Sequence, residues 1–416
     1  MRFAHLAALV AAVAVASVAD ASQTVASDAP IADGSGAWTK QEHLIQQKYP
    51  IWFDVSKDGL YAAYWDKEYN FAVHPLTDPI LTSEGRGDNY NNPLEAFTDF
   101  SSSYKFRLSS RSDGDLRVAA VDASLDPDFK GQVAVFTLVE SVVPLLIYWA
   151  QAGSTLVGDP GEGFGYSLSI SDDGMVLAVG SDVPDLVEAS NNIYAEGNSP
   201  EGFVRVFKYI SADDTWTQLG DKIEATSASR NLDSCSISGD GFSVAVFDQS
   251  VGFTQVYKTN TLDASSGSAQ WTLVGDPVET YGEPVLSYDG TVMAAGNAVF
   301  ELTRDSQWRQ VLYVDGVLGR ASISSNGTRV AIASHTSDPK VHIFQRNPRS
   351  LEWDVLDRID TDTTWYVKLS SDGSRVTFVD EYVALQVYDV GGCDYSNVPS
   401  AERGDPPSCA AGEIQI

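Results

Sequence analysis

One short motif recurs seven times in the chain and limits its fold more than any other feature. In each copy, alternating apolar and polar residues meet Asp-Gly or Asn-Gly, and β-branched and small apolar residues follow. Asp-Gly and Asn-Gly favour a tight hairpin turn, because both central turn positions require positive φ. The turn glycines are Gly59, Gly114, Gly174, Gly241, Gly290, Gly327 and Gly373.

Two further segments complete each repeat. The run after the turn, such as "LAVG" or "VAIA", is almost wholly apolar, as expected for a strand buried on both faces. A third run ends in an aromatic residue, for example "FVRVF" at 203–207, and a fourth carries Trp, for example "TWTQLGD" at 215–221. Seven units of four strands predict an all-β fold, a seven-bladed β-propeller with four-stranded blades.

The ends of the chain predict how the propeller closes. Residues 1–21 have the pattern of a signal peptide, and 22–36 are interpreted as a flexible leader. Residues 37–390 form the propeller, whose last repeat lacks a fourth strand, and the Trp-bearing segment 37–46 is expected to supply it. Residues 391–416 are expected to be an irregular tail in which Cys393 and Cys409 can pair, whereas Cys235 is expected to be a buried free thiol.

The charge balance argues against polyanionic partners. The chain has 27 basic and 57 acidic residues, a formal net charge of −30, which disfavours nucleic acid and anionic membranes. No segment after the signal peptide is apolar for long enough to span a bilayer, so no membrane insertion is expected. The sequence therefore predicts a secreted protein.

Common catalytic motifs are absent from the sequence. It contains no Gly-x-Ser-x-Gly, His-Glu-x-x-His or Gly-x-x-x-x-Gly-Lys. Paired carboxylates such as Asp172 and Asp173 lie at a turn of the repeat, where Asp173 is expected to form the turn and Asp172 to be solvated. With so many acidic residues, paired carboxylates in a pocket could still support glycoside hydrolysis, and this alternative stays open.

A polar ring at the ends of the second strands is the candidate binding site. If the strand before each turn is innermost, these ends lie on the face opposite the turns, together with the insertions 81–99 and 182–202. The alternative is that these polar strand ends are simply solvated and bind no ligand. The candidate ligand-binding residues are Asp66, Asp122, Asp182, Asp248, Asn297, His335 and Asp380.

The third repeat also carries a family resemblance. Gly163-Phe164-Gly165, the turn at 171–174 and Gly180-Ser181 resemble the repeats of secreted algal and bacterial propellers of the FG-GAP or integrin-α-like type. That resemblance implies a propeller fold. The calcium loop of integrin-type blades is matched by no repeat, so calcium binding at the turns is not implied, although Ca²⁺ elsewhere stays open.

These observations predict a non-catalytic, extracellular propeller that binds a protein or glycan through its loop-rich face, in adhesion or in an extracellular matrix. The alternative is a propeller-fold polysaccharide hydrolase or lyase that uses aspartates at the channel mouth. Asn326 begins the sequon Asn-Gly-Thr at a turn and is a candidate glycosylation site.

Overall fold

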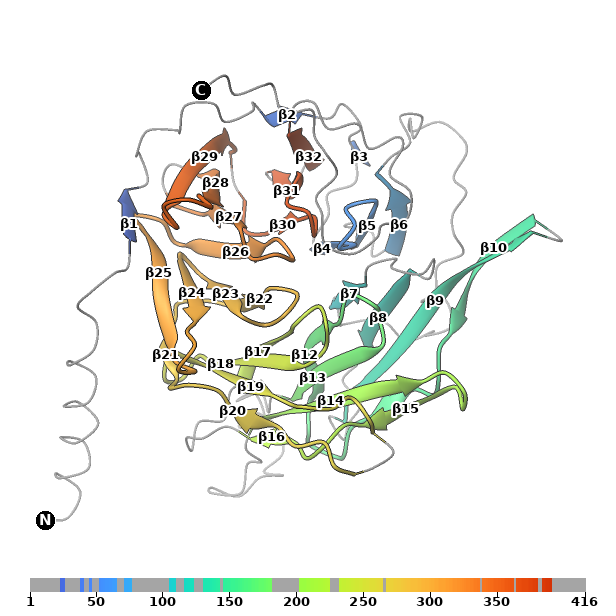
Figure 1. Cartoon of the computed structure of the whole chain (residues 1–416). Coiled ribbons are helices and arrows are strands. Elements are labelled where there is room, and N and C mark those ends of the chain that lie inside the picture. The colour runs from blue at the N-terminus through green and yellow to red at the C-terminus, as the bar shows by residue number, and fades with distance from the viewer. Residues whose placement is uncertain are drawn as a thin grey trace, which may run out of the picture.

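The computed structural model shows seven antiparallel sheets arranged around a central axis, which confirms the seven-bladed β-propeller (Figure 1). The structure describes residues 23–26, 38–40, 45–46, 52–65, 71–76, 105–109, 116–122, 130–142, 145–181, 202–224, 232–264, 267–336, 339–362, 364–380 and 384–390. No helix in this part of the chain is long and apolar enough to cross a membrane.

Each blade begins with its innermost strand. Blade one contains β4 (Trp52–Val55), β5 (Tyr61–Trp65) and β6 (Phe71–Pro75), and blade two contains β7 (Phe106–Leu108), β8 (Arg117–Asp122), β9 (Gln132–Val142), β10 (Leu145–Gln151) and β11 (Leu156–Val157). Blade three contains β12 (Phe164–Ile170), β13 (Val176–Ser181), β14 (Phe203–Ile210), β15 (Thr215–Gln218) and β16 (Ile223–Glu224). Blade four contains β17 (Leu232–Ile237), β18 (Ser243–Asp248), β19 (Phe253–Lys258), β20 (Thr272–Leu273) and β21 (Val278–Glu279).

The last three blades each end in a long outer strand or in the N-terminal segment. Blade five contains β22 (Pro284–Leu286), β23 (Val292–Ala295), β24 (Ala298–Leu302), β25 (Trp308–Asp315) and β1 (Gln23–Ala26). Blade six contains β26 (Gly319–Ile323), β27 (Arg329–Ser334), β28 (Lys340–Arg346) and β29 (Trp353–Asp360). Blade seven contains β30 (Val367–Leu369), β31 (Arg375–Asp380), β32 (Ala384–Val390), β2 (Trp38–Lys40) and β3 (Ile45–Gln46).

The hydrophobic core lies between the blades. Every residue of β13, β18 and β23 is buried, as the apolar second runs predicted. One cluster of buried apolar side chains joins each pair of neighbouring blades, including Phe53 and Val55 of blade one with Leu385 and Val387 of blade seven. Because the clusters run all the way round, each blade is stabilised by both of its neighbours.

The repeated turn is built by a serine and an acid or amide. In blade three, Ser171 donates a hydrogen bond of 2.6 Å to Asp173 Oδ1, which also accepts the N–H of Met175 at 2.9 Å. Ser171 Oγ in turn accepts the N–H of Val176 at 2.9 Å. The same bonds recur in the turns of blades one, four, five, six and seven. Asp173 therefore forms the turn, as expected.

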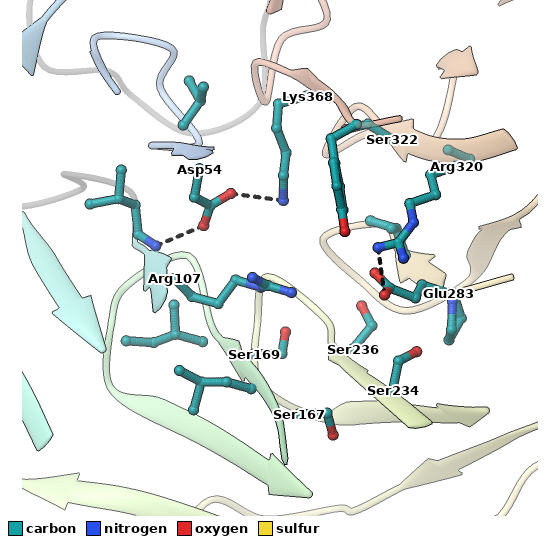
Figure 2. A pocket seen from close by; sticks show the side chains of 18 of the residues that line it. Asp54, Arg107, Ser167, Ser169, Ser234, Ser236, Glu283, Arg320, Ser322 and Lys368 are labelled. Carbon is teal, nitrogen blue, oxygen red and sulfur yellow. Dashed lines mark hydrogen bonds and ion pairs between the residues drawn. The ribbon is translucent and has the colours of Figure 1, made fainter. Parts of the chain in front are cut away.

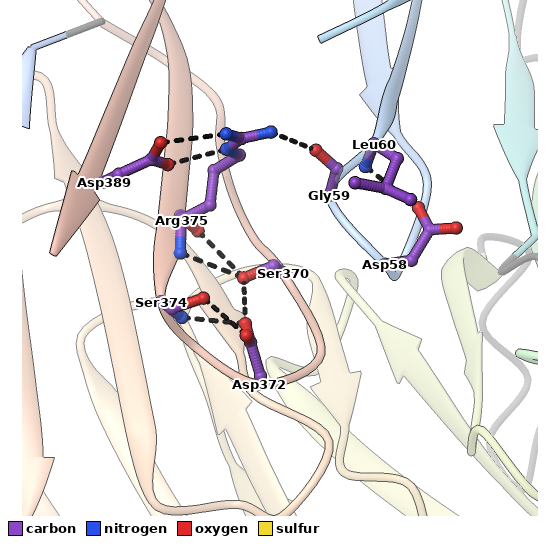
Figure 3. A network of polar contacts seen from close by, with 8 residues as sticks. All are labelled: Asp58, Gly59, Leu60, Ser370, Asp372, Ser374, Arg375 and Asp389. Carbon is purple, nitrogen blue, oxygen red and sulfur yellow. Dashed lines mark hydrogen bonds and ion pairs between the residues drawn. The ribbon is translucent and has the colours of Figure 1, made fainter. Parts of the chain in front are cut away.

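The turn glycines also serve contacts between blades. Gly241 has φ +78°, and a Cβ there would lie 2.7 Å from Val176 of the preceding blade. At the closure, Gly59 of blade one packs on Arg375 of blade seven, which donates a 2.7 Å hydrogen bond to the Gly59 carbonyl (Figure 3). Arg375 is held by Asp389 through bonds of 2.6 and 2.8 Å, and both residues are buried.

The N-terminal segment closes the last blade. Trp38 to Lys40 of β2 pair with β32, and β3 pairs with the other end of the same strand, which confirms the predicted fourth strand of blade seven. This arrangement covers the edge that β32 would otherwise expose.

One short part of the expected leader is ordered. β1 adds to blade five in parallel with β25, so the interpretation of 22–36 as a flexible leader is wrong for residues 23–26. Gln23 holds β1 there, because its side chain pairs with the backbone N–H (2.6 Å) and carbonyl (2.9 Å) of Trp353 in blade six. The predicted signal peptide, residues 391–416 and the pair Cys393 and Cys409 lie outside the described residues.

Tryptophans of the outer strands link neighbouring blades. The indole N–H of Trp216 donates to the Ala152 carbonyl at 2.8 Å, and that of Trp271 donates to the Leu219 carbonyl at 2.8 Å. Trp308 bonds Val274 in the same way at 2.9 Å. Each link runs to the preceding blade, so it stabilises the ring as well as the sheet.

Candidate functional site: the central channel

A channel runs along the propeller axis. The innermost strands β4, β7, β12, β17, β22, β26 and β30 line it. Because side chains alternate along a strand, two positions of each strand point into it, two and four residues before the turn serine.

The two positions form two layers. The deeper layer contains Asp54, Arg107, Ser169, Ser236, Val285, Ser322 and Lys368, and the layer nearer the mouth contains Trp52, Lys105, Ser167, Ser234, Glu283, Arg320 and Tyr366. Figure 2 shows charged and hydroxyl groups from several strands converging on one space. The described channel wall is therefore polar, although an apolar core surrounds it.

The repeated turns meet at one end of this channel and link blade to blade. In these turns, the backbone N–H of the first or second residue after the turn serine donates a hydrogen bond to a backbone carbonyl of the next blade. These bonds are Asp172 to Gly239 (3.0 Å), Asp240 to Tyr288 (2.9 Å), Tyr288 to Ser325 (2.8 Å), Ser325 to Ser371 (2.7 Å) and Ser371 to Lys57 (2.5 Å). They connect blades three to seven and blade one, and Asp172 of blade three contacts Lys57 and Ser325 across the ring, so the channel narrows at this end.

Asp172 lies within this narrow end and is not solvated, contrary to expectation. It is 8% exposed, and its carboxylate lies 3.9 Å from Lys57 Nζ of blade one and accepts a 3.3 Å hydrogen bond from Ser325 of blade six. Burial raises the pKa of Asp172 above its ordinary value, and Lys57 and Ser325 offset this only in part. The sequence did not reveal this burial, because it arises where turns of distant repeats meet.

Replacing Asp172 by asparagine is expected to stabilise the protein at neutral pH by about 1 kcal/mol, because one buried carboxylate oxygen has no hydrogen-bond partner. The raised pKa means that the folded state binds a proton more tightly, so ionisation costs stability as pH rises. The advantage of Asp172→Asn should therefore vanish below about pH 4. Urea unfolding at several pH values measures this, with Asp173→Asn as the control. A gain that is equal at all pH values contradicts the assignment.

The channel is basic although the protein is strongly acidic. Five cationic residues line it, Lys57, Lys105, Arg107, Arg320 and Lys368, against two carboxylates, Asp54 and Glu283. With Asp172 at the narrow end, the channel carries five positive and three negative charges, a net +2, in a chain of net charge −30. Such a concentration of one sign inside a low-dielectric cavity attracts the opposite sign.

Asp54 and Lys368 form the central ion pair. Lys368 Nζ lies 2.7 Å from Asp54 Oδ1, and Asp54 Oδ2 accepts the N–H of Leu108 at 2.9 Å, so the pair joins blades seven, one and two (Figure 2). Burial would raise the pKa of Asp54, but Lys368, Arg107 and the Leu108 N–H outweigh it and lower that pKa. Burial, with repulsion from Arg107 and Lys57, lowers the pKa of Lys368 despite its partner.

The mouth layer combines charges with aromatic rings. Arg320 pairs with Glu283 at 2.6 Å, and its guanidinium lies 4.3 Å from the centre of the Tyr366 ring. Lys105 lies 4.0 Å from the centre of the Tyr166 ring and donates to the Tyr166 carbonyl. Cations over aromatic faces are held in place while remaining accessible on one side.

Exposed apolar side chains surround the mouth. Tyr281, Leu318 and Trp365 precede the first strands of blades five, six and seven, and Tyr166 lies near the start of β12. Val251 and Phe253 lie at the connection between β18 and β19. Trp365 is 43% exposed and stacks on His335, with ring centres 4.4 Å apart. The structure thus places the candidate residue His335 beside an aromatic residue that the sequence analysis did not single out.

The other described candidates are engaged locally. Asp248 accepts hydrogen bonds from the N–H and hydroxyl of Ser250, Asn297 donates to the Val314 carbonyl, and Asp380 accepts from Thr361 and Asp362. No described residue of the predicted polar ring lines the channel. Asp122 ends β8, and Asp66 and Asp182 lie outside the described residues. A ligand at these positions stays a prediction.

The remaining sequence candidates can be placed as follows. Cys235 is a buried free cysteine, as expected, and burial raises the pKa of its thiol to about 11. Asn326 is exposed at its turn, where its side-chain oxygen accepts from Ser324 and Thr328; its glycosylation stays a prediction. No group of three or more His, Cys, Asp or Glu among the described residues could hold a metal ion, and calcium binding stays a prediction.

Comparisons with known proteins give no family. No family model matches the chain, and no curated protein matches it. Among solved structures, the chain is similar to a functionally unknown protein from Desulfotomaculum acetoxidans, at 11% identity and a TM-score of 0.46, over 82% of this chain and 92% of that one. Membership of the FG-GAP type stays a prediction.

Proposed function

We propose that the protein is a secreted, non-catalytic propeller that binds a protein or glycan ligand over the mouth of its central channel. The observation that carries this proposal is the exposed Trp365, stacked on His335 next to the channel-lining Tyr366. A supported, solvent-exposed aromatic face suits the apolar face of a sugar ring or an apolar side chain of a partner.

The carboxylates of the channel favour binding over glycoside hydrolysis. A glycosidase acid needs a carboxyl group whose pKa is raised beside the substrate. Asp54 has a lowered pKa, and both Asp54 and Glu283 are ion-paired with basic residues. Asp172 does have a raised pKa, but it lies at the narrow end, away from the mouth.

Replacing Trp365 by alanine is expected to weaken ligand binding at least tenfold, because aromatic anchors at the centre of an interface contribute about 2 kcal/mol or more. Glycan and protein arrays, with and without calcium, identify the ligand, and titration then compares the variants. Tyr148→Ala is the control, since Tyr148 is similarly exposed (37%) but lies on β10. Equal binding by Trp365→Ala and the parent contradicts the proposed face.

A further inference from the structure

Arg107 is a cation of the channel wall that forms no ion pair with any carboxylate of the described residues. Its only hydrogen bond in the described structure runs from Nη1 to the Phe106 carbonyl of its own strand, at 3.0 Å. No carboxylate among the described residues lies within ion-pair distance, whereas Lys368 and Arg320 each have one. The guanidinium lies 5.1 Å from the centre of the Trp52 ring. A guanidinium held in this way presents its remaining N–H groups to the channel.

Serine hydroxyls of the same layer are available as further donors. The Oγ atoms of Ser169 and Ser236 already accept backbone N–H groups of the next blade, those of Ile237 (3.0 Å) and Leu286 (3.2 Å). An oxygen that accepts in this way keeps its own hydrogen for donation, and neither hydroxyl donates a hydrogen bond to a described residue. Figure 2 shows the Arg107 guanidinium and these two hydroxyl groups pointing into one space.

We propose that this part of the channel binds an oxyanion, the sulfate, phosphate or carboxylate group of a ligand, through Arg107, Ser169 and Ser236. The three residues lie on consecutive blades and offer N–H and O–H donors, and a guanidinium fork matches two oxygens of such a group. The net charge of the lining has the complementary sign. Asp54 attracts Arg107 beyond ion-pair distance, but its ion pair is with Lys368, and Glu283 forms its ion pair with Arg320.

The inference does not depend on the proposed function, since an oxyanion can enter the channel whether or not the mouth binds a larger ligand. Two sources share the chemistry: a free inorganic anion and an acidic sugar. Titration with sodium sulfate, sodium phosphate and sodium glucuronate, against sodium chloride at equal ionic strength and against glucose, distinguishes them. Binding of sulfate or phosphate indicates the inorganic source, and binding of glucuronate but not glucose indicates an acidic sugar.

Arg107→Gln is the decisive variant. We expect it to weaken oxyanion binding about tenfold or more, because a charge-assisted hydrogen bond is lost, and Arg107→Lys to retain part of the affinity. In chloride alone, Arg107→Gln should change the Tm little, because the guanidinium forms no ion pair with a described residue. Isothermal titration and thermal unfolding measure both effects.

Arg309→Gln makes the same change of charge at an exposed position of strand β25 and serves as the matched control. It should bind oxyanions like the parent protein. The inference is overturned if none of the three oxyanions binds. It is also overturned if sulfate and phosphate do not bind and glucose binds as well as glucuronate does. Equal oxyanion affinities of Arg107→Gln and Arg309→Gln would overturn it too. If oxyanions bind normally to Trp365→Ala while no array ligand is found, only the proposed function fails.

Discussion

Replacing Asp389 by alanine is expected to destabilise the protein by about 3–5 kcal/mol, because the buried Arg375 guanidinium would lose the carboxylate that binds it through two hydrogen bonds. Arg375 also bonds the Gly59 carbonyl, so the change weakens the contact that joins the last blade to the first (Figure 3). Urea denaturation followed by circular dichroism measures the loss.

Two further variants separate this role from a general effect of charge. Glu224→Ala removes one partner of the exposed pair with Lys222 and should change stability little, since exposed ion pairs contribute little. The double change Arg375→Met with Asp389→Leu leaves no unpaired buried charge and should be less destabilised than Asp389→Ala alone. If Asp389→Ala is as stable as Glu224→Ala, the closure does not depend on this pair.

The repeat could be read from sequence because its determinants are local. A serine, an acid or amide and a glycine within four residues build each turn, and Ser171, Asp173 and Gly174 are close in the chain as well as in space. The apolar second strands follow at a fixed distance, so the number of blades follows from counting. The fourth strand of blade seven was predictable for the same reason, because its Trp38 repeats a pattern seen in other blades.

The site was not predictable in the same way, because closure of the ring creates it. Asp54 and Lys368 lie at opposite ends of the chain and meet only when blade seven packs on blade one. Asp172 resembles a solvated turn residue until turns from blades one, four and six surround it. The alternation of the first strands contained a usable signal, since four of the five channel cations lie two or four residues before a turn serine; Lys57 is the exception.

Replacing Asp54 by alanine is expected to cost about 3–5 kcal/mol at neutral pH, because Lys368 would lose its partner and the Leu108 N–H its acceptor. Denaturant unfolding measures the loss. Asp360→Ala is the matched control, since Asp360 pairs with Lys340 at 3.1 Å but is 89% exposed, and it should change stability little. Lys368→Met combined with Asp54→Ala should recover part of the loss, because it removes the unpaired ammonium.

The pH dependence of an isosteric variant tests the role of charge at Asp54. Its lowered pKa means that the unfolded chain binds a proton more readily, so its contribution is complete above the unfolded pKa of about 3.9 and is lost as pH falls through the folded value. Asp54→Asn lacks this contribution, so the stability difference from the parent protein should shrink as pH falls below about 4. Only that difference is informative, because the many other acidic residues titrate in both proteins. A difference that stays constant through the acidic range would show that Asp54 acts through hydrogen bonding or packing and not through its charge.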